Sequence, residues 1–473
     1  MLLLNNKMPI VLFVLMVLTN NLVAQNQDNA WSTATIIPPQ YESFKPPSAG
    51  QWFTDPVFGT RIKRLTDDQN IYGWNGERAM FSKDDKYFLI AVNSPHRLRL
   101  FDGRTGDMIR DLPLTISDTS IMRWSYDPQM LVYASGSRLI GYNVATNKKT
   151  TLKVFSQQIG DSRGRLCGGD GNDFDDAGEW LLLNMGTQMF AYNIRNGETG
   201  PQKDLSGFDV DYCTISPSGN YIIATTSQAK YVWNRDWTNE RRLLDKNRHM
   251  DMGYLDGSEE CVISRVGAAI MYAVRFSDGK KFEVLSSDRW FSPMLSAVGG
   301  SNKKFVYLAM RAHELDPKQE WYRYFGELVQ VPLTKEASPI RRLAHHRTRI
   351  AVNGTSFADQ PELWINHAGD RLFFRSNMDN YVQKGRHDLY MIKLDELSLS
   401  TSTEETRHTQ IYTQKKEIII SSDLPSMSSV YDIMGRLITK SSEKRIPIHQ
   451  PGIYIVVVEQ EHKPSYRKKV LVQ

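Results

Sequence analysis

The chain has 473 residues, of which 41% are hydrophobic and 11% aromatic, and its formal net charge is +5. This length is too great for one ordinary hydrophobic core, although a ring of small sheets can reach it as a single domain. Positions 405–473 hold 11 Lys and Arg against 7 Asp and Glu, and Lys7 supplies a further positive charge, so the main body is neutral. A neutral main body argues against nucleic acid as its target.

Residues 1–24 are predicted to be an export signal. Lys7 precedes an apolar run from about Pro9 to Leu18, and Ala24 supplies a small residue at the expected cleavage position. A basic start, a short apolar centre and a small residue at the cut are typical of a signal peptide. The apolar run is short for a transmembrane anchor, and no Cys follows it as in a lipoprotein. The alternative is an uncleaved apolar tail. Residues 25–54 form an N-terminal extension.

One pattern of short strands and tight turns repeats along residues 55–396. In its clearest copy four predicted strands follow one another, at Arg78–Ser82, Tyr87–Val92, Leu98–Phe101 and Met108–Leu112. Asp- and Gly-containing turns join them, as hairpins with positive φ require. Seven unequal copies predict an all-β fold, namely a seven-bladed β-propeller. Six to eight blades are compatible, because the copy from Trp290 to Arg349 is irregular, and an open β-solenoid or two β-sandwiches are the alternatives.

The two ends of this repeat region complement each other. The last copy stops at its third strand, Asp388–Lys393, before the polar stretch Ser398–Thr403. Near the other end, Thr60–Thr66 reads as a strand that has no copy of its own. We therefore expect the N-terminal strand to complete the last blade, which closes the ring and removes two exposed sheet edges.

Three cysteines, Cys167, Cys213 and Cys261, are an odd number for an exported protein, so at least one is unpaired in a monomer. Cys213 and Cys261 lie within apolar strand patterns. Buried, inert thiols are therefore expected rather than a disulfide framework or a nucleophile.

The composition changes after a Ser/Thr/Glu-rich linker at residues 397–408. Positions 409–473 contain five short predicted strands and form a small Ig-like β-sandwich. Within it, Val430–Asp432, Gly435–Arg436, Pro451–Tyr454 and Lys469–Leu471 follow one another in sequence.

This order of motifs closely resembles the C-terminal sorting domain of type IX secretion substrates, and the match covers nearly the whole tail. The resemblance implies export across the outer membrane by the type IX machinery, with the protein secreted or held at the outer cell surface of a Gram-negative bacterium. It does not decide between release and attachment to surface polysaccharide.

Polar residues recur where the innermost strand of each predicted blade begins. They are Asp170, Asn172, Asp209, Asp211, His249, Asp251, Asp359 and Gln360. In a propeller these positions converge on the axial channel. Carboxylates and amides are hard oxygen ligands, so the ring indicates a site for sugar hydroxyls or a divalent cation. The alternative is that these residues only solvate a water-filled channel.

The stretches Asp55–Thr66 and Asp388–Lys393 resemble TolB-like propellers and, more narrowly, oligogalacturonate lyases. The resemblance implies a histidine base and a metal held by a His-Pro-His-Pro motif. The matching stretch here runs from Asp359 through Gln360, Pro361 and Glu362, so both motif histidines are absent.

Other residues offer less specific signals. His249 is the best single candidate for a catalytic base, because an imidazole near neutral pKa can remove a proton α to a carboxylate. The adjacent pair His345 and His346 is interpreted as a solvated loop pair, and His313, His367 and His387 as surface residues. Trp321 and Tyr322, in a long insertion of the irregular copy, are candidates for stacking on sugar rings.

The sequence contains no Walker loop, no Gly-x-Ser-x-Gly elbow, no His-Glu-x-x-His and no cysteine pair at zinc spacing. The leading interpretation is a secreted or cell-surface propeller that binds a polysaccharide or a surface protein, without a transmembrane anchor. The alternative is a polysaccharide lyase or related carbohydrate-active enzyme with an atypical metal site.

Overall fold

The computed structural model divides the chain into two compact units, Met1–Lys393 and Leu394–Gln473. The residues that the structure describes are 29–41, 43–67, 71–72, 80–92, 97–114, 122–162, 164–168, 172–245, 250–266, 270–286, 293–297, 303–310, 321–336, 338–348, 361–378, 387–394, 409–414, 416–422, 426–432, 436–460 and 466–472. Within these ranges, no helix is long and apolar enough to cross a membrane.

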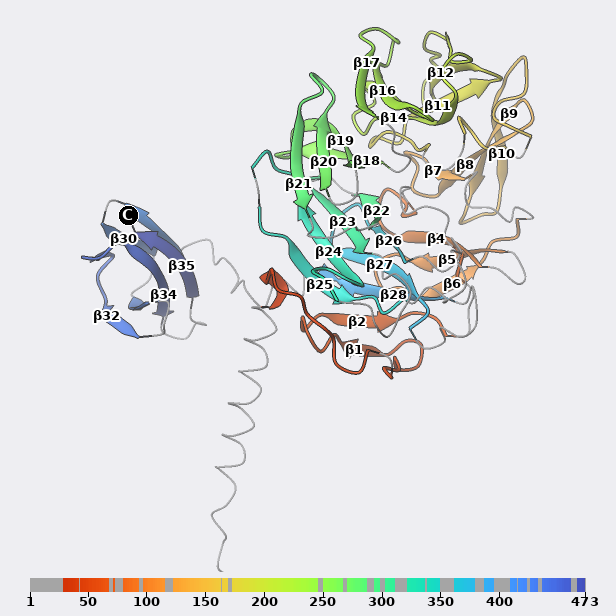
Figure 1. Cartoon of the computed structure of the whole chain (residues 1–473). Helices are drawn as coiled ribbons and strands as arrows, with labels where there is room; N and C mark the ends of the chain where they lie inside the picture. Colours follow the sequence, from red (N-terminus) through yellow and green to blue (C-terminus); the bar gives the residue numbers. More distant parts are fainter. Residues whose placement is uncertain are drawn as a thin grey trace, which may run out of the picture. The chain divides into compact units, whose positions relative to one another are not determined.

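The described part of the first unit forms seven small antiparallel sheets that follow one another along the chain (Figure 1). Two four-stranded sheets come first: β3–β6 (Ile71–Tyr72, Tyr87–Val92, Arg97–Asp102, Met108–Asp111) and β7–β10 (Arg123–Trp124, Met130–Ser135, Arg138–Asn143, Lys149–Val154). The next sheet has three strands, β11–β13 (Trp180–Met185, Gln188–Asn193, Lys203–Asp204). Three four-stranded sheets follow: β14–β17 (Val210–Ile215, Tyr221–Thr226, Ala229–Asn234, Arg241–Asp245), β18–β21 (Asp251–Leu255, Glu259–Val266, Ile270–Arg275, Lys281–Ser286) and β22–β25 (Pro293–Ala297, Phe305–Met310, Glu327–Pro332, Arg341–His345).

The seventh sheet joins the two ends of the unit. Its strands lie in the order β1, β2, β28, β27, β26 and are Trp52–Thr54, Arg61–Arg64, Asp388–Lys393, Arg371–Ser376 and Glu362–Ile365. The N-terminal strand β2 pairs with β28 near the end of the unit, with Ile62 opposite Ile392 and Arg64 opposite Tyr390. This pairing confirms the predicted closure of the ring. Strand β1 adds a further strand outside it, in residues that were predicted to belong to the N-terminal extension.

A buried ion pair fastens this closure. Asp388 at the start of β28 is 1% exposed, and it accepts hydrogen bonds from Arg64 Nη2 at 2.8 Å and from Thr66 Oγ1 at 2.9 Å. Thr66 Oγ1 also accepts the Leu389 amide, so backbone and side chains from both ends of the unit are joined. The buried carboxylate is thus compensated by an arginine from the opposite end of the chain.

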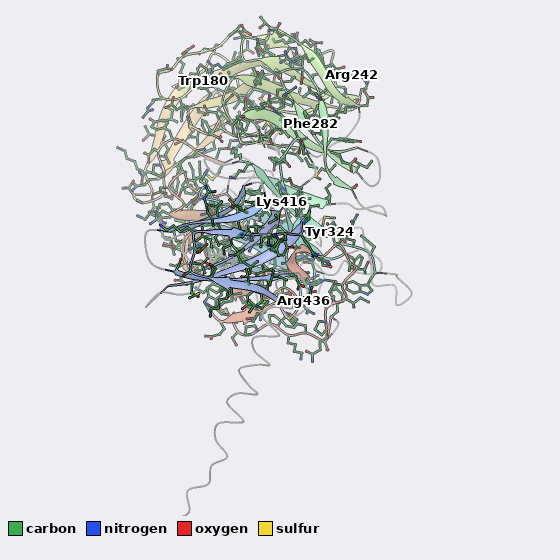
Figure 2. All side chains as sticks on the ribbon, turned by 90° about the vertical axis from the view of Figure 1, so that its left-hand side faces the viewer. Trp180, Arg242, Phe282, Tyr324, Lys416 and Arg436 are labelled. Carbon is green, nitrogen blue, oxygen red and sulfur yellow. The ribbon has the colours of Figure 1, made fainter. Side chains whose placement is uncertain are left out.

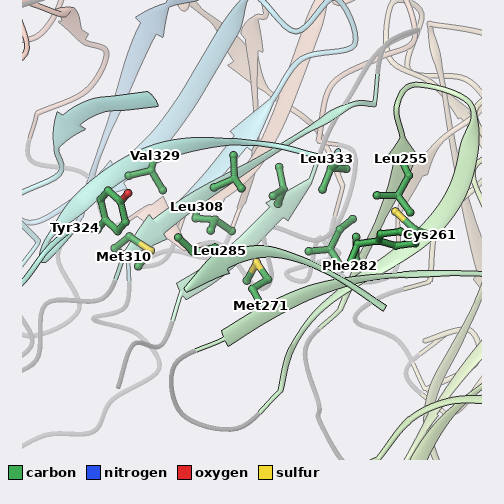
Figure 3. Packing of buried hydrophobic residues seen from close by; sticks show 14 residues of the cluster. Leu255, Cys261, Met271, Phe282, Leu285, Leu308, Met310, Tyr324, Val329 and Leu333 are labelled. Carbon is green, nitrogen blue, oxygen red and sulfur yellow. The ribbon is translucent and has the colours of Figure 1, made fainter. Parts of the chain in front are cut away.

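The middle strands of the sheets are largely buried, because side chains of adjacent sheets form shared buried clusters. Figure 2 draws the side chains of the described residues on the ribbon. All six residues of β4 are buried, which explains its continuous apolar sequence Tyr-Phe-Leu-Ile-Ala-Val. Between the sheets that contain β19 and β23, side chains from both form one cluster that includes Leu255, Phe282 and Leu308 (Figure 3). The core of the unit is therefore divided into several layers between sheets rather than gathered at one centre.

The turns that join the first two strands of a sheet show why glycine and aspartate recur there. An example is the turn between Phe174, which bridges Leu181, and β11, where Asp175 Oδ1 accepts the amides of Glu179 and Trp180 at 2.8 and 3.0 Å. Gly178 has φ +70°, and a Cβ at this position would lie 2.4 Å from the backbone nitrogen of Tyr126 in the preceding sheet. Only glycine fits this turn against its neighbour.

The second unit is a small β-sandwich, as predicted. One sheet contains β29 (Thr409–Gln414), β30 (Glu417–Ser422) and β33 (Arg445–Pro447). The other has the order β32 (Leu437–Ser441), β31 (Ser426–Asp432), β34 (Gly452–Gln460), β35 (Tyr466–Val472). These are seven strands in the described residues, two more than the sequence pattern predicts. Their facing side chains, among them Ile418, Val430 and Val456, form one buried cluster.

All three cysteines are buried and free, which confirms the prediction for them. Burial raises the pKa of the Cys261 thiol to about 12 and raises the pKa of Cys167 and Cys213 as well. The thiolate form, which is the reactive one, is therefore suppressed.

Candidate functional site

The innermost strands of the seven sheets run in the same direction along the ring, as in a propeller. The ring therefore has a start end, where these strands begin, and a turn end, where each is joined to its second strand. Buried polar side chains occur at the start of several inner strands: Arg123 on β7, Asn172 just before Phe174, which bridges Leu181 of β11, Asp251 on β18 and Glu362 on β26. The start end is thus the candidate site.

Arg123 joins two neighbouring sheets at the start end. It is 1% exposed, and its Nε donates to the carbonyl oxygen of Asn172 at 2.8 Å. The Asn172 side chain in turn donates through Nδ2 to the Leu182 carbonyl at 2.9 Å. A guanidinium group and an amide are therefore held together by the backbone of adjacent strands.

Glu362 and Arg375 form a buried ion pair across β26 and β27. They are opposite each other in the register, and Arg375 Nη2 lies 3.1 Å from Glu362 Oε1. Their side chains are 5% and 1% exposed, and Arg375 Nη1 also reaches the Ile71 carbonyl of the next sheet at 3.5 Å. The pair is held because each charge compensates the other away from water.

Four of the predicted site residues, Asp170, His249, Asp359 and Gln360, lie outside the described residues. Of the others, Asn172 and Asp251 are buried at the start end, and Asp251 Oδ1 accepts the Met252 amide at 2.8 Å.

Asp209 and Asp211 are exposed where β14 begins. The described geometry therefore keeps part of the predicted ring in the interior and leaves part of it on the surface.

The described residues do not form a metal site. Among them, no group of three or more His, Cys, Asp or Glu side chains is arranged to hold an ion. Glu362 stands where the lyase-like motif would carry a histidine, and its carboxylate is bound to Arg375 instead. A carboxylate compensated by a buried guanidinium is a poor cation ligand. The described residues of the start end therefore do not fit the metal that the lyase-like motif would hold.

The turn end of the ring is bridged by a second polar cluster, the cross-axis cluster, which consists of Lys83, Asp175, Asp176, Tyr254 and Lys303. Lys303, before β23, forms an ion pair with Asp176, before β11. Asp176 belongs to the sheet that contains β11, and Lys303 to the sheet that contains β23. Two sheets lie between these in one direction around the ring and three in the other, so the ion pair crosses the interior of the ring. Tyr254 Oη donates to the same carboxylate at 3.4 Å, and Lys83 Nζ donates to the Asp175 carbonyl at 3.1 Å.

Burial is the main cause of the pKa shifts at Lys83 in the cross-axis cluster and at the nearby His367. Burial lowers the pKa of Lys83, although the nearby carboxylates of Asp173, Asp176 and Asp175 oppose this shift. His367 is lowered to a pKa of about 3 by burial and by the positive charges of Lys83 and Lys303, so it is neutral at physiological pH. The contacts among these side chains cross the ring at its turn end.

The pair His345 and His346 is buried, so its interpretation as a solvated loop pair was wrong. His345 stacks on Phe58 with ring centroids 5.0 Å apart, and its two ring nitrogens lie 3.7 and 3.6 Å from carboxylate oxygens of Asp55 and Glu327. The interpretation of His387 as a surface residue was also wrong, because it is 0% exposed. His313 lies outside the described residues. Asp55 and Phe58, near the N-terminus, contact His345, and a local sequence pattern does not reveal this.

Trp321 and Tyr322 belong to a packed aromatic group. The Trp321 ring lies 4.9 Å from that of Tyr41 and 4.8 Å from that of Phe325, and Tyr322 lies 5.0 Å from Phe325. Tyr322 is 9% exposed. Their described contacts are thus with the N-terminal extension and with each other.

Sequence reasoning missed Arg123, Arg375 and the cross-axis cluster. The repeat offered a signal for some of them. Lys83, Asp175 and Asp176 stand in the same turn of different copies, and Arg123 begins an inner strand as the predicted acids do. Arg375 gave no signal, because its role depends on the register of β27 against β26.

Neither a protein-family model nor a curated protein matches the chain. Its solved structural neighbours include an oligogalacturonate lyase from Vibrio parahaemolyticus, with 13% identity and a TM-score of 0.51, covering 72% of this chain and 96% of that one. Another is an oligogalacturonate lyase in complex with manganese, with 14% identity and a TM-score of 0.49, covering 75% and 100%. A third is hydrazine synthase of Kuenenia stuttgartiensis, with 10% identity and a TM-score of 0.42, covering 65% and 93%. At these identities the likeness concerns the fold alone, which is an all-β propeller like that of the lyase from Vibrio parahaemolyticus.

Proposed function

We propose that the first unit is a binding propeller for acidic glycans, which it takes up at the start end of the ring. The observation that carries the proposal is the pair of buried guanidinium groups there, Arg123 and Arg375. Guanidinium is planar and offers paired donors that match the carboxylate of a uronate. Both groups are 1% exposed, so the proposal requires the start end to open far enough for a uronate to reach them. Buried backbone and carboxylate partners hold both groups in place before a ligand arrives.

A binding role is favoured over bond cleavage by the composition of the same end. Glu362 replaces a motif histidine and is neutralised by Arg375. The ion pair binds and orients, but it supplies neither a Lewis acid nor a base poised near neutral pH.

The second candidate function is a polysaccharide lyase with an atypical site. The fold likeness to an oligogalacturonate lyase supports it, as does His249 as a candidate base. In that case His249 would act as the base.

For the second unit, the proposal is that the β-sandwich acts as a sorting domain for type IX secretion. The ordered motifs of the tail and its independent compact fold support this assignment. The protein would then be secreted or displayed at the outer surface of a Gram-negative bacterium.

Calorimetric titration with oligogalacturonides tests the binding proposal. The wild-type protein, without residues 1–24, is expected to bind them and to ignore neutral cello-oligosaccharides of equal length. R375K and R123K keep the charge but lose the paired donors, so each is expected to weaken binding about tenfold, or about 1.4 kcal/mol. R195K is the control, because Arg195 is largely exposed and pairs with Glu179 in a turn distant from the start end. Equal binding of acidic and neutral sugars, or no binding by the folded wild-type protein, contradicts the proposal.

A further inference from the structure

Cys167 is held in a backbone conformation that cysteine rarely adopts. Its φ is +50°, in the left-handed region where glycine or asparagine normally stands. Its amide donates to Asn184 Oδ1 at 2.8 Å, and its carbonyl oxygen accepts the Cys213 amide at 2.9 Å. Two neighbouring sheets therefore fix this unusual conformation, one through Asn184 on β11 and the other through Cys213 on β14.

The hydrogen bond between the two backbones brings Cys167 and Cys213 within the reach of a disulfide. With standard bond lengths, this bond limits the separation of the two Cα atoms to about 7 Å, and the bond angles shorten it further. A disulfide spans Cα separations of about 4.4–6.8 Å. Both side chains are 0% exposed and belong to one cluster between the sheets that contain β11 and β14. After burial, the Cys213 sulfur is the next cause that raises the pKa of Cys167, so the two thiols are neighbours.

The surroundings of the three cysteines single out this pair. Cys167 Sγ donates to the Leu182 carbonyl at 3.4 Å, and a disulfide would remove that S–H. The Leu182 carbonyl would still accept its other hydrogen bond, from Asn172 Nδ2 at 2.9 Å. Cys261 lies in a different cluster, between β19 and β23 (Figure 3). Cys261 is therefore the thiol that stays unpaired in the odd set of three.

We propose that Cys167 and Cys213 form a disulfide when the exported chain folds in an oxidising compartment, and that the structure describes the reduced form of this pair. The inference rests on the proposed export only for its oxidant, which is a protein disulfide of the cell envelope. Both sulfurs are buried in the folded unit, so the reaction takes place before folding is complete.

The reaction is a thiol–disulfide exchange in two steps. One cysteine thiolate attacks the disulfide of the oxidant, whose other sulfur leaves as a thiolate. The second cysteine thiolate then attacks this mixed disulfide. The S–S bond between Cys167 and Cys213 forms, and the oxidant leaves as a dithiol that has gained two electrons and two protons.

The disulfide would tie two sheets together at the start end of the ring. The segment around Cys167 already runs close to β14, because a Cβ at Gly168 would lie 2.0 Å from the Asp211 carbonyl oxygen. Asn172 follows this segment, and its carbonyl oxygen accepts the hydrogen bond from Arg123. A crosslink from Cys167 to β14 therefore constrains the unfolded chain and stabilises the segment that leads to Asn172.

Counting free thiols tests the proposal. The full chain is made in the bacterium that produces it, and cells and medium are treated with N-ethylmaleimide in denaturant. The intact mass of the exported chain should show one adduct, at Cys261, and three adducts after reduction. C261S should show none before reduction and two after it. C213A, and C167G with a residue that suits the positive φ, should each show two without reduction. Three adducts on the exported wild-type chain, or a disulfide that contains Cys261, overturn the proposal.

A refolding experiment separates this pairing from the proposed export. The reduced chain without residues 1–24 is unfolded, refolded in a mixture of reduced and oxidised glutathione, and its protease-resistant fraction is alkylated in the same way. If the chain in cells is retained with three thiols but the refolded one shows one adduct, the export role fails and the pairing stands. Three adducts on the refolded chain overturn the pairing. The oxidised protein should also unfold at a higher urea concentration than the reduced one, a shift that C261S keeps and C213A loses.

Discussion

The buried ion pair that closes the ring permits a quantitative prediction. In D388N the shape of the side chain is kept, but the negative charge opposite Arg64 is lost. Both residues are at most 5% exposed, so the arginine would be left uncompensated in the interior. Loss of one partner of a buried pair costs about 3–5 kcal/mol. We expect the free energy of unfolding of the first unit to fall by about this amount.

Urea unfolding followed by tryptophan fluorescence measures this loss. All 10 tryptophans lie between positions 31 and 364, so the signal reports the first unit alone. The control is D107N, which breaks the ion pair between Lys63 on the same strand β2 and Asp107, whose side chain is 68% exposed. An exposed pair contributes about 0–1 kcal/mol. If D388N unfolds at the same urea concentration as D107N, the closure does not depend on this buried pair, and the reasoning is refuted.

Three more predictions concern the interior. L308A, in the fully buried layer between two sheets, should lower the free energy of unfolding by about 2–5 kcal/mol in the same assay, and a change below about 1 kcal/mol would mean that the layer is loosely packed. Burial lowers the pKa of His346 to about 4 from 6.5, so His346 takes up a proton in the unfolded chain at a higher pH than in the folded one. The free energy of unfolding should therefore fall by up to about 3 kcal/mol as the pH drops from 6.5 to 4. H346Q should reduce this dependence on pH. The three buried thiols should react with a colorimetric thiol reagent only after unfolding, and rapid labelling of the native protein would contradict their burial.

The closure of the ring could be predicted from sequence because both leftover strands carried a complete local signal. Thr60–Thr66 is a short run that contains Ile62 and Leu65, Asp388–Lys393 contains four consecutive apolar residues, and the turn residues around them fix the repeat. The β-sandwich of the second unit could be predicted for the same reason, since its strands carry local sequence patterns. Strand β1 was missed because three residues, Trp52–Thr54, are too few to show a period.

The polar interior was less predictable. The burial of His345 depends on the N-terminal residues Asp55 and Phe58, which are nearly 290 positions away in the chain. The pairing of Lys303 with Asp176 depends on how the sheets are arranged around the ring. A local pattern contains neither of these, so sequence reasoning pointed to Asn172 and Asp251 as polar residues near the start of inner strands but did not reveal Arg123, Arg375 or their partners.

The central claim is that the start end of the ring binds acidic glycans without cleaving them. The most direct measurement follows a single sample of the protein with oligogalacturonides by calorimetry and by the ultraviolet absorbance of unsaturated uronate ends. The account predicts saturable binding heat with no growth of that absorbance. Growth of the absorbance over many turnovers, abolished in H249A, would contradict it and establish the lyase instead.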